Sequence, residues 1–127
     1  MDSLKIEATE DSPFINMDIG TKTLIISGES RPENASKFYS PILKWIVDLA
    51  EVLPSKRDKI SFVFKLDYFN SISAKYIMDI ILILKRYIDN GYTVNIEWHY
   101  DKRDDDMLDA GKEYAEAAGL KFDFIEF

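Results

Sequence analysis

The sequence predicts a single α/β domain that has a mixed sheet of about six strands and three main helices. The chain has 127 residues, of which 46% are hydrophobic and 13% aromatic, enough for one compact core and too few for two. Its second half alternates strand-like and helix-like segments, a pattern typical of parallel crossovers. Its beginning holds only short strand-like segments between turn residues. We therefore expect one domain over residues 1–127, with parallel strands in its C-terminal half.

The N-terminal segments predict an antiparallel hairpin or meander. Leu4 to Glu7 alternates in polarity, Phe14 to Asp18 lies before the Gly20 turn, and Thr23 to Ser27 is β-branched and apolar before Gly28.

A first helix is predicted to begin at Ser30-Arg31-Pro32-Glu33, which has the S-x-x-E spacing of a capping box. Apolar residues then recur at helical spacing up to Pro54: Phe38, Ile42, Trp45, Leu49 and Val52. Pro41 lacks an amide donor and should kink this helix. A helix that begins only at Ser40, just before Pro41, stays an alternative.

The rest of the chain predicts strand, helix, strand, helix and strand. The periodicities and the caps Gly91 and Gly119 place these elements at Lys59 to Leu66, Asn70 to Asn90, Tyr92 to Trp98, Asp104 to Ala118, and Phe122 to Glu126.

Composition excludes several classes of function. A net charge of −7 without a basic cluster makes nucleic acid an unlikely partner. The absence of cysteine removes disulfides and thiolate chemistry. No apolar run is long enough for membrane insertion, and Asp2 stands where a signal peptide would carry positive charge, so we expect a cytoplasmic protein.

Catalytic chemistry has little support. The five glycines are scattered, so no loop is predicted to cradle phosphates and no cofactor is expected. His99 is the single histidine and is better interpreted as a strand-edge residue than as a general base. The densest acidic group follows it: Asp101, Asp104, Asp105, Asp106 and Asp109.

We interpret this acidic group as a solvated helix cap, with an acidic docking surface as the second choice. A small metal-binding protein or enzyme that uses His99 and Asp104 to Asp106 is an alternative, because carboxylates suit hard cations. No metal site is predicted.

The segment Asp67 to Lys75 is the most informative one, because it turns a strand into a helix and places Ser71 and Ser73 in the first turn. Asn70 or Ser71 is a natural N-cap, and local chemistry alone favours a simple cap. The alternative is a phosphorylation site at an exposed Ser71, where a phosphoryl group adds a charge of about −1.5 to −2.

The helix that follows carries more apolar surface than one sheet face requires. The predicted core stripe is Ser73, Ile77, Ile80, Ile81, Leu84 and Ile88, and the opposite side is Lys75, Asp79 and Arg86. The flanks are Ile72, Tyr76 and Ile83 on one side and Met78 and Leu82 on the other. Either neighbouring helices cover this excess, which is the interpretation that we favour, or the excess forms an interaction ridge beside Ser71.

Four segments in order resemble the SiaC family of biofilm-regulating phosphoproteins, relatives in fold of the STAS domains of anti-sigma-factor antagonists. They are Ser27 to Ala35, Phe38 to Pro41, Tyr68 to Ser71, and Glu97 to Tyr100 leading to Asp104-Asp105-Asp106-Met107. Two positions depart from the family pattern Tyr-Phe-Asn-Thr-Ser-Ser-Ser-Lys by losing a hydroxyl, Ile72 and Ala74, and Ser71 replaces its threonine.

The resemblance implies a partner switch in cyclic-di-GMP signalling. The unphosphorylated form would bind and activate a diguanylate cyclase; a dedicated kinase would phosphorylate Ser71, with Ser73 as fallback, and a PP2C-type phosphatase would reverse this. The partner would contact the start of the helix: Tyr68, Phe69, Asn70, Ile72, Lys75, Tyr76 and Asp79. A STAS-like module with a different effector, such as an anti-sigma factor, stays the alternative.

Overall fold

The computed structural model describes residues 1–127, which form one six-stranded sheet in the order β1-β2-β3-β4-β5-β6. The strands are β1 (Leu4–Ile6), β2 (Phe14–Asp18), β3 (Thr23–Ser30), β4 (Ile60–Phe69), β5 (Val94–Tyr100) and β6 (Asp123–Glu126). The first two pairings are antiparallel, and every pairing from β3 to β6 is parallel. The predicted mixed sheet with a parallel C-terminal half is therefore confirmed.

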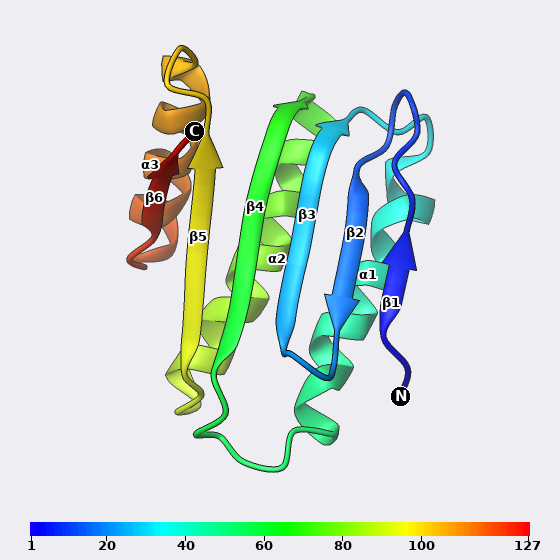
Figure 1. Ribbon diagram of the computed structural model, residues 1–127, viewed down its shortest axis with the longest axis vertical. Helices are drawn as coiled ribbons and strands as arrows, with labels where there is room; N and C mark the ends of the chain where they lie inside the picture. The colour runs from blue at the N-terminus through cyan, green and yellow to red at the C-terminus, as the bar shows by residue number, and fades with distance from the viewer.

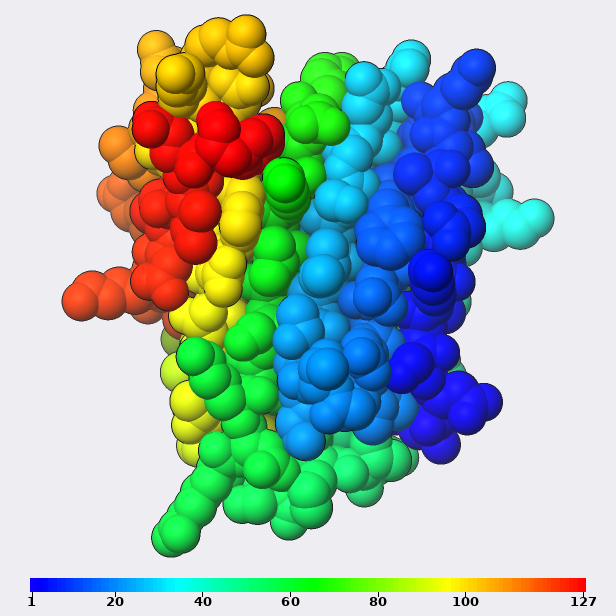
Figure 2. Space-filling model, viewed as in Figure 1, coloured from blue at the N-terminus to red at the C-terminus, as the bar shows by residue number.

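All three helices cover the same face of this sheet (Figure 1). They are α1 (Ala35–Asp48), α2 (Ser71–Asp89) and α3 (Asp105–Ala118), and a short 3₁₀ turn, η1 (Leu49–Glu51), follows α1. The other face is uncovered (Figure 2). None of the helices is both long enough and apolar enough to cross a membrane.

The core lies between the sheet and the helices, because alternate strand residues point to one face. Its fully buried strand residues include Ile26, Phe62, Phe64 and Trp98. The three aromatic rings form a continuous row, with centroids 4.5 Å apart between the two phenylalanines and 5.3 Å apart between Phe64 and Trp98. The helices pack against this row of rings.

The start of α1 differs from the prediction. Asn34, not Ser30, is its N-cap, and the Asn34 side chain accepts a hydrogen bond from the Lys37 amide. Ser30 is instead the last residue of β3, because this strand continues past a bulge at Gly28 and pairs with β4 up to Phe69. The capping-box prediction is therefore wrong, and so is the alternative start at Ser40. Pairing with a neighbouring strand outweighed a local cap.

The end of α1 also comes earlier than its apolar pattern indicated. The helix stops at Asp48, and the 3₁₀ turn carries the chain to Glu51 instead of the helix running to Pro54. By contrast, α2 and α3 lie within one residue of their predicted bounds, with Asn70 and Asp104 as N-caps.

Close contact between α3 and β5 depends on one glycine. A Cβ atom on Gly111 would lie 2.5 Å from the Trp98 ring, and the Trp98 indole donates a hydrogen bond to the Met107 carbonyl at 2.9 Å. Only glycine permits this approach, which places the N-terminus of α3 beside the ends of β4 and β5.

Candidate functional site

The candidate site lies where β4 ends and α2 begins, at the upper end of the sheet in Figure 1. Asn70 separates the two elements: its side-chain oxygen accepts the Ser73 amide at 2.8 Å, and its own amide donates to the Ser30 carbonyl at 3.0 Å. Ser71 is then the first helical residue, and it is exposed. Because Asn70 is the cap, the Ser71 hydroxyl is not needed to satisfy the helix end.

Beneath Ser71 lies a buried chain of hydroxyl groups. Tyr39, Ser30 and Ser73 are all 0% exposed. The Ser30 hydroxyl contacts the Tyr39 hydroxyl and donates a hydrogen bond of 2.8 Å to the Ser73 hydroxyl. The Ser73 hydroxyl donates in turn to the Ser30 carbonyl at 3.0 Å. One consistent proton order runs from Tyr39 to Ser30 to Ser73 to that carbonyl, and burial raises the pKa of Tyr39.

The two candidate serines therefore differ sharply in environment. The Ser73 hydroxyl is enclosed and already engaged in hydrogen bonds, whereas Ser71 faces solvent. A kinase needs an accessible hydroxyl, so this geometry favours Ser71 over the fallback Ser73.

Exposed apolar side chains flank Ser71. Tyr68 at the end of β4 is 49% exposed, and Ile72, which follows Ser71, is 56% exposed. Lys75 and Asp79 are also exposed on the same side of α2. These four exposed residues, two apolar and two charged, lie at the end of β4 and on the first turns of α2, in the same part of the chain as Ser71.

The other predicted contact residues are partly internal. Tyr76 is half-buried and stacks on Tyr39, with ring centroids 5.1 Å apart and planes 5° apart. Phe69 is half-buried and its ring lies 6.1 Å from that of Tyr114. These two side chains support the surface more than they present it.

The flanks of α2 bear out in part the favoured interpretation, that neighbouring helices cover its excess apolar surface, and the interaction ridge stays a prediction. Ile83 and Tyr87 are buried, and the Tyr87 hydroxyl reaches carbonyls of α1, so a neighbouring helix covers this flank. Ile72 and Leu82 stay exposed. The predicted core stripe is buried except for Ile88, which is half-buried because it lies near the helix end.

Acidic side chains border the site on its other side. Asp67, Asp104 and Asp106 line a cavity of about 380 Å³ that reaches Tyr68 and Phe69. Asp104 caps α3 by accepting the Met107 amide at 3.0 Å, as the cap interpretation predicted. The Arg103 side chain holds the pKa of Asp101 at about 2. No group of three or more histidine, aspartate or glutamate side chains is placed to hold a metal ion.

His99 lies away from this site, on the uncovered face of β5, where its Nε2 atom is 2.9 Å from a Glu97 carboxylate oxygen. It is the last residue but one of β5, so it lies near a strand end as expected, although β5 is not an edge strand of the sheet.

Sequence reasoning missed the roles of Ser30 and Tyr39 in this site. Nothing in the local pattern marks either residue, because they meet Ser73 only when β3, α1 and α2 pack together. A buried polar position at the end of a strand was the single available signal, and the capping-box interpretation concealed it.

Comparison with known proteins gives a consistent result over nearly the whole chain. The family model described as SiaC family regulatory phosphoprotein matches residues 6–127. A curated, uncharacterized protein of Pseudomonas aeruginosa strain UCBPP-PA14 is 28% identical over 122 residues, which cover 96% of this chain and 94% of that protein.

Solved structures agree in fold with this chain. Apo-SiaC from Pseudomonas aeruginosa superimposes with a TM-score of 0.85 at 28% identity, covering 99% of this chain and 98% of that one. In the crystal structure of the diguanylate cyclase SiaD in complex with its activator SiaC, from the same organism, the match has a TM-score of 0.89 at 27% identity and covers 98% of this chain and 99% of that one. The chain belongs to the SiaC family of regulatory phosphoproteins.

Proposed function

We propose that this protein is a phosphorylation-switched interaction module whose unphosphorylated form binds and activates a diguanylate cyclase, and that phosphorylation of Ser71 releases the cyclase. The observation that carries the proposal is the exposed Ser71 hydroxyl between the exposed apolar side chains of Tyr68 and Ile72. The cyclase complex of the related SiaC supports the class of partner.

Release follows from the surroundings of the hydroxyl. A partner that packs on Tyr68 and Ile72 removes water from this surface. A phosphoryl group with a charge of about −1.5 to −2 then loses hydration at the interface. On the side of Tyr68 and Phe69, Asp67, Asp104 and Asp106 line the neighbouring cavity and provide no positive charge. The modified surface therefore disfavours the complex.

The same phosphoryl group should leave the fold intact. Ser71 is the first residue of α2, where the helix dipole favours negative charge, and the cap role belongs to Asn70. Lys75 lies four residues further along the helix and can pair with the phosphate. The switch thus acts on the partner and not on folding.

The two departures from the family pattern have different consequences. Ala74 is half-buried, and its carbonyl accepts a hydrogen bond from the Tyr114 hydroxyl at 2.8 Å, so this position faces α3. Ile72 is exposed, so its partner must provide an apolar contact where a hydroxyl would have required a polar one.

The proposal includes a dedicated serine kinase that modifies Ser71 and a PP2C-type phosphatase that restores it. In this scheme the chain itself acts by binding and not as an enzyme, in keeping with the activator role of SiaC in its complex. The proposed contact surface is that of the sequence prediction: Tyr68, Phe69, Asn70, Ile72, Lys75, Tyr76 and Asp79.

The test combines phosphate mapping with binding. The wild-type protein, Ser71→Ala and Ser73→Ala are incubated with the kinase and ATP, and mass spectrometry locates the phosphate. We expect modification of the wild type and Ser73→Ala at Ser71, and none of Ser71→Ala. Phosphate that remains on the Ser71→Ala protein would refute the assignment.

Binding of the cyclase is then measured by calorimetry for Ser71→Asp and for Ser55→Asp. Ser55 is an exposed serine at the opposite end of the molecule, so its substitution adds the same charge far from the site. We expect Ser71→Asp to weaken binding about tenfold or more and Ser55→Asp to leave it unchanged. Equal effects of the two variants would contradict a local switch.

A further inference from the structure

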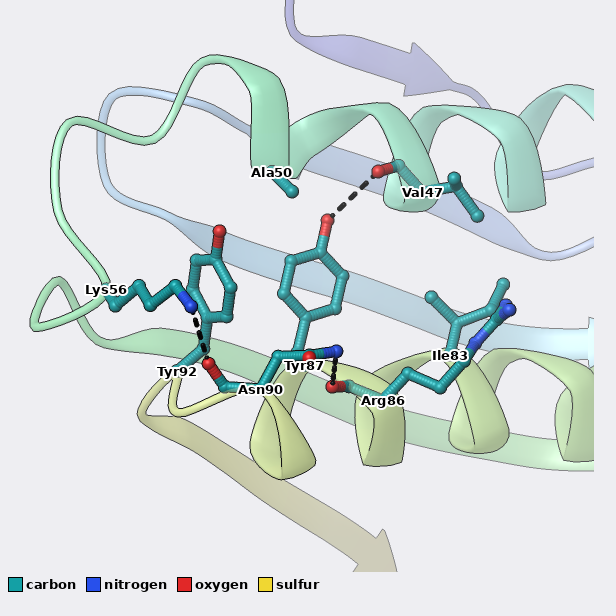
Figure 3. A pocket seen from close by; sticks show the side chains of 8 residues that line it. All are labelled: Val47, Ala50, Lys56, Ile83, Arg86, Tyr87, Asn90 and Tyr92. Atoms are coloured by element: carbon teal, nitrogen blue, oxygen red, sulfur yellow. Dashed lines mark hydrogen bonds between the residues drawn. The ribbon is translucent and has the colours of Figure 1, made fainter.

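A second cavity lies at the other end of α2, between the C-terminal ends of α1 and α2 (Figure 3). Its volume is about 290 Å³. Its lining comes from both helices and the loops that follow them: Val47, Ala50, Lys56, Ile83, Arg86, Tyr87, Asn90 and Tyr92. This is near the lower end of the size range of small-molecule sites, about 300–1,000 Å³.

Two tyrosine rings form a rigid wall of this cavity. Tyr87 and Tyr92 meet edge to face, with centroids 5.0 Å apart and planes at 80°. The Tyr87 hydroxyl donates to the Ile46 carbonyl and lies 3.3 Å from that of Val47, which ties α2 to α1. Burial raises the pKa of Tyr87 to about 12, so this hydroxyl stays protonated. The wall is therefore preformed.

Two cations border the same cavity. The Lys56 ammonium donates a hydrogen bond of 2.8 Å to the Asn90 carbonyl, at the C-terminal end of α2, and lies 5.4 Å from the centre of the Tyr92 ring. The Arg86 guanidinium has no hydrogen bond or ion pair within the chain. Of the acids near it, Asp89 pairs with Lys85, and Asp79 lines a neighbouring surface cavity that Arg86 also borders.

The absence of carboxylates from the lining distinguishes this cavity. Four other surface cavities each have two or three aspartate or glutamate side chains in their lining. This one has none, although the chain carries a net charge of −7. An apolar, aromatic pocket with an unpaired arginine and no acid is complementary to an organic anion.

We propose that this cavity binds a small organic anion that has a carboxylate on an apolar body about the size of one aromatic ring. The carboxylate pairs with Arg86, on the side of the cavity next to Ile83, and the ring lies against Tyr87. Val47 and Ala50 close the apolar side. The inference is independent of Ser71, which lies at the opposite end of the helix.

Phenylacetate serves as the probe, and phenylacetamide is its neutral counterpart of the same shape. Amide shifts of the isotope-labelled, full-length protein are followed by NMR during titration. We expect phenylacetate to shift the amides of Tyr87, Asn90 and Tyr92, with a Kd of about 1 mM. Phenylacetamide should bind about tenfold more weakly, because it makes no charge-assisted pair.

Two variants locate the site. Arg86→Gln should bind phenylacetate about tenfold more weakly and remove its advantage over phenylacetamide. Lys112→Gln removes an exposed charge on α3 and should bind phenylacetate as the wild type does. Ala50→Leu fills the cavity and should abolish binding of both probes.

The proposal fails if phenylacetate shifts no amide of the cavity at 10 mM, or shifts them no more than phenylacetamide does. It also fails if Arg86→Gln binds phenylacetate like the wild type while its spectrum shows a folded protein. Neither result would bear on phosphorylation of Ser71, so the two proposals are refuted separately.

Discussion

The two ends of α2 are ordered by different means. At the N-terminal end, hydroxyl groups that are 0% exposed connect Ser73 to Ser30 and Tyr39, and a cavity lined by acidic side chains lies beside the end of β4, which precedes Ser71. At the C-terminal end, Lys56 and Asn90 take the last helix carbonyls at the surface, and a cavity without acids lies beside them.

This difference follows from the direction of the peptide dipoles. A helix N-terminus attracts negative charge and a C-terminus attracts cations. At the N-terminal end, Ser71 occupies a position where negative charge is favourable, and a phosphoryl group can be added to its exposed hydroxyl. At the C-terminal end, Lys56 interacts with the helix dipole, whereas Arg86 has no partner within the chain. One rigid helix can therefore carry a covalent switch at one end and a ligand site at the other.

The largest effect should come from placing a charge on Ser73, whereas the same charge on the neighbouring Ser71 should have little effect. Ser73→Asp buries a carboxylate among hydroxyls that are 0% exposed, so we expect a loss of about 3–5 kcal/mol in the free energy of unfolding. Ser71→Asp places the same group in an exposed first turn and should change stability by less than about 1 kcal/mol. Urea unfolding measures both. Comparable losses would show that the two serines do not differ in environment.

An intermediate effect on stability is expected when one buried tyrosine hydroxyl is removed near each end of α2, and its size should differ between the two ends. Tyr39→Phe breaks a fully buried hydroxyl chain and should reduce the free energy of unfolding by about 1–3 kcal/mol. Tyr87→Phe removes one hydroxyl from carbonyls of α1, and we expect a loss of about 0.5–1.5 kcal/mol. The unfolding midpoints in urea give the comparison.

The matched control for each substitution is its aromatic neighbour. Tyr76→Phe and Tyr92→Phe remove hydroxyls that form no hydrogen bond within the chain, and both should be near neutral. If Tyr87→Phe proves more costly than Tyr39→Phe, the hydroxyl chain is not what orders the N-terminal end.

The smallest effect is a loss of stability at low pH, from an ion pair near the N-terminal end of α2. The Asp101 pKa is about 2, first because the Arg103 side chain donates hydrogen bonds to it. Since the folded pKa lies below the unfolded value, this pair adds stability above pH about 4 and loses it as the pH falls through about 2. The contribution is small because the pair is exposed to solvent.

Carbon-detected NMR titration of the Asp101 carboxyl measures this pKa directly. Arg103→Gln should return it towards its ordinary value of about 3.9. A wild-type value near that figure would mean that the pair does not persist in solution.

Local patterns were sufficient for most of the fold, because burial on one face of a strand or helix repeats with a fixed period. The bounds of α2 could be placed within one residue, since Asn70 is a good N-cap and Gly91 has the positive φ of 92° that only glycine adopts easily. The exposure expected for Ser71 could be derived in the same way. The family resemblance then singled out this serine as a regulatory residue.

The start of α1 could not be predicted, although its capping box looked convincing. Ser30 and Glu33 have the right spacing, but β3 extends to Ser30 because its pairing with β4 continues to Phe69. Hydrogen bonds between strands that are distant in sequence decide where each strand ends, and no local pattern records them.

The sequence by itself thus determined the order of strands and helices, the parallel half of the sheet and the one exposed serine at the start of α2. Only the tertiary structure decided that Ser73 is enclosed with Ser30 and Tyr39, and that Arg86 borders a cavity without acids. The physical reason is the same in both cases. Each feature joins residues from separate elements, and their contacts exist only after α1 and α2 have packed side by side on the sheet.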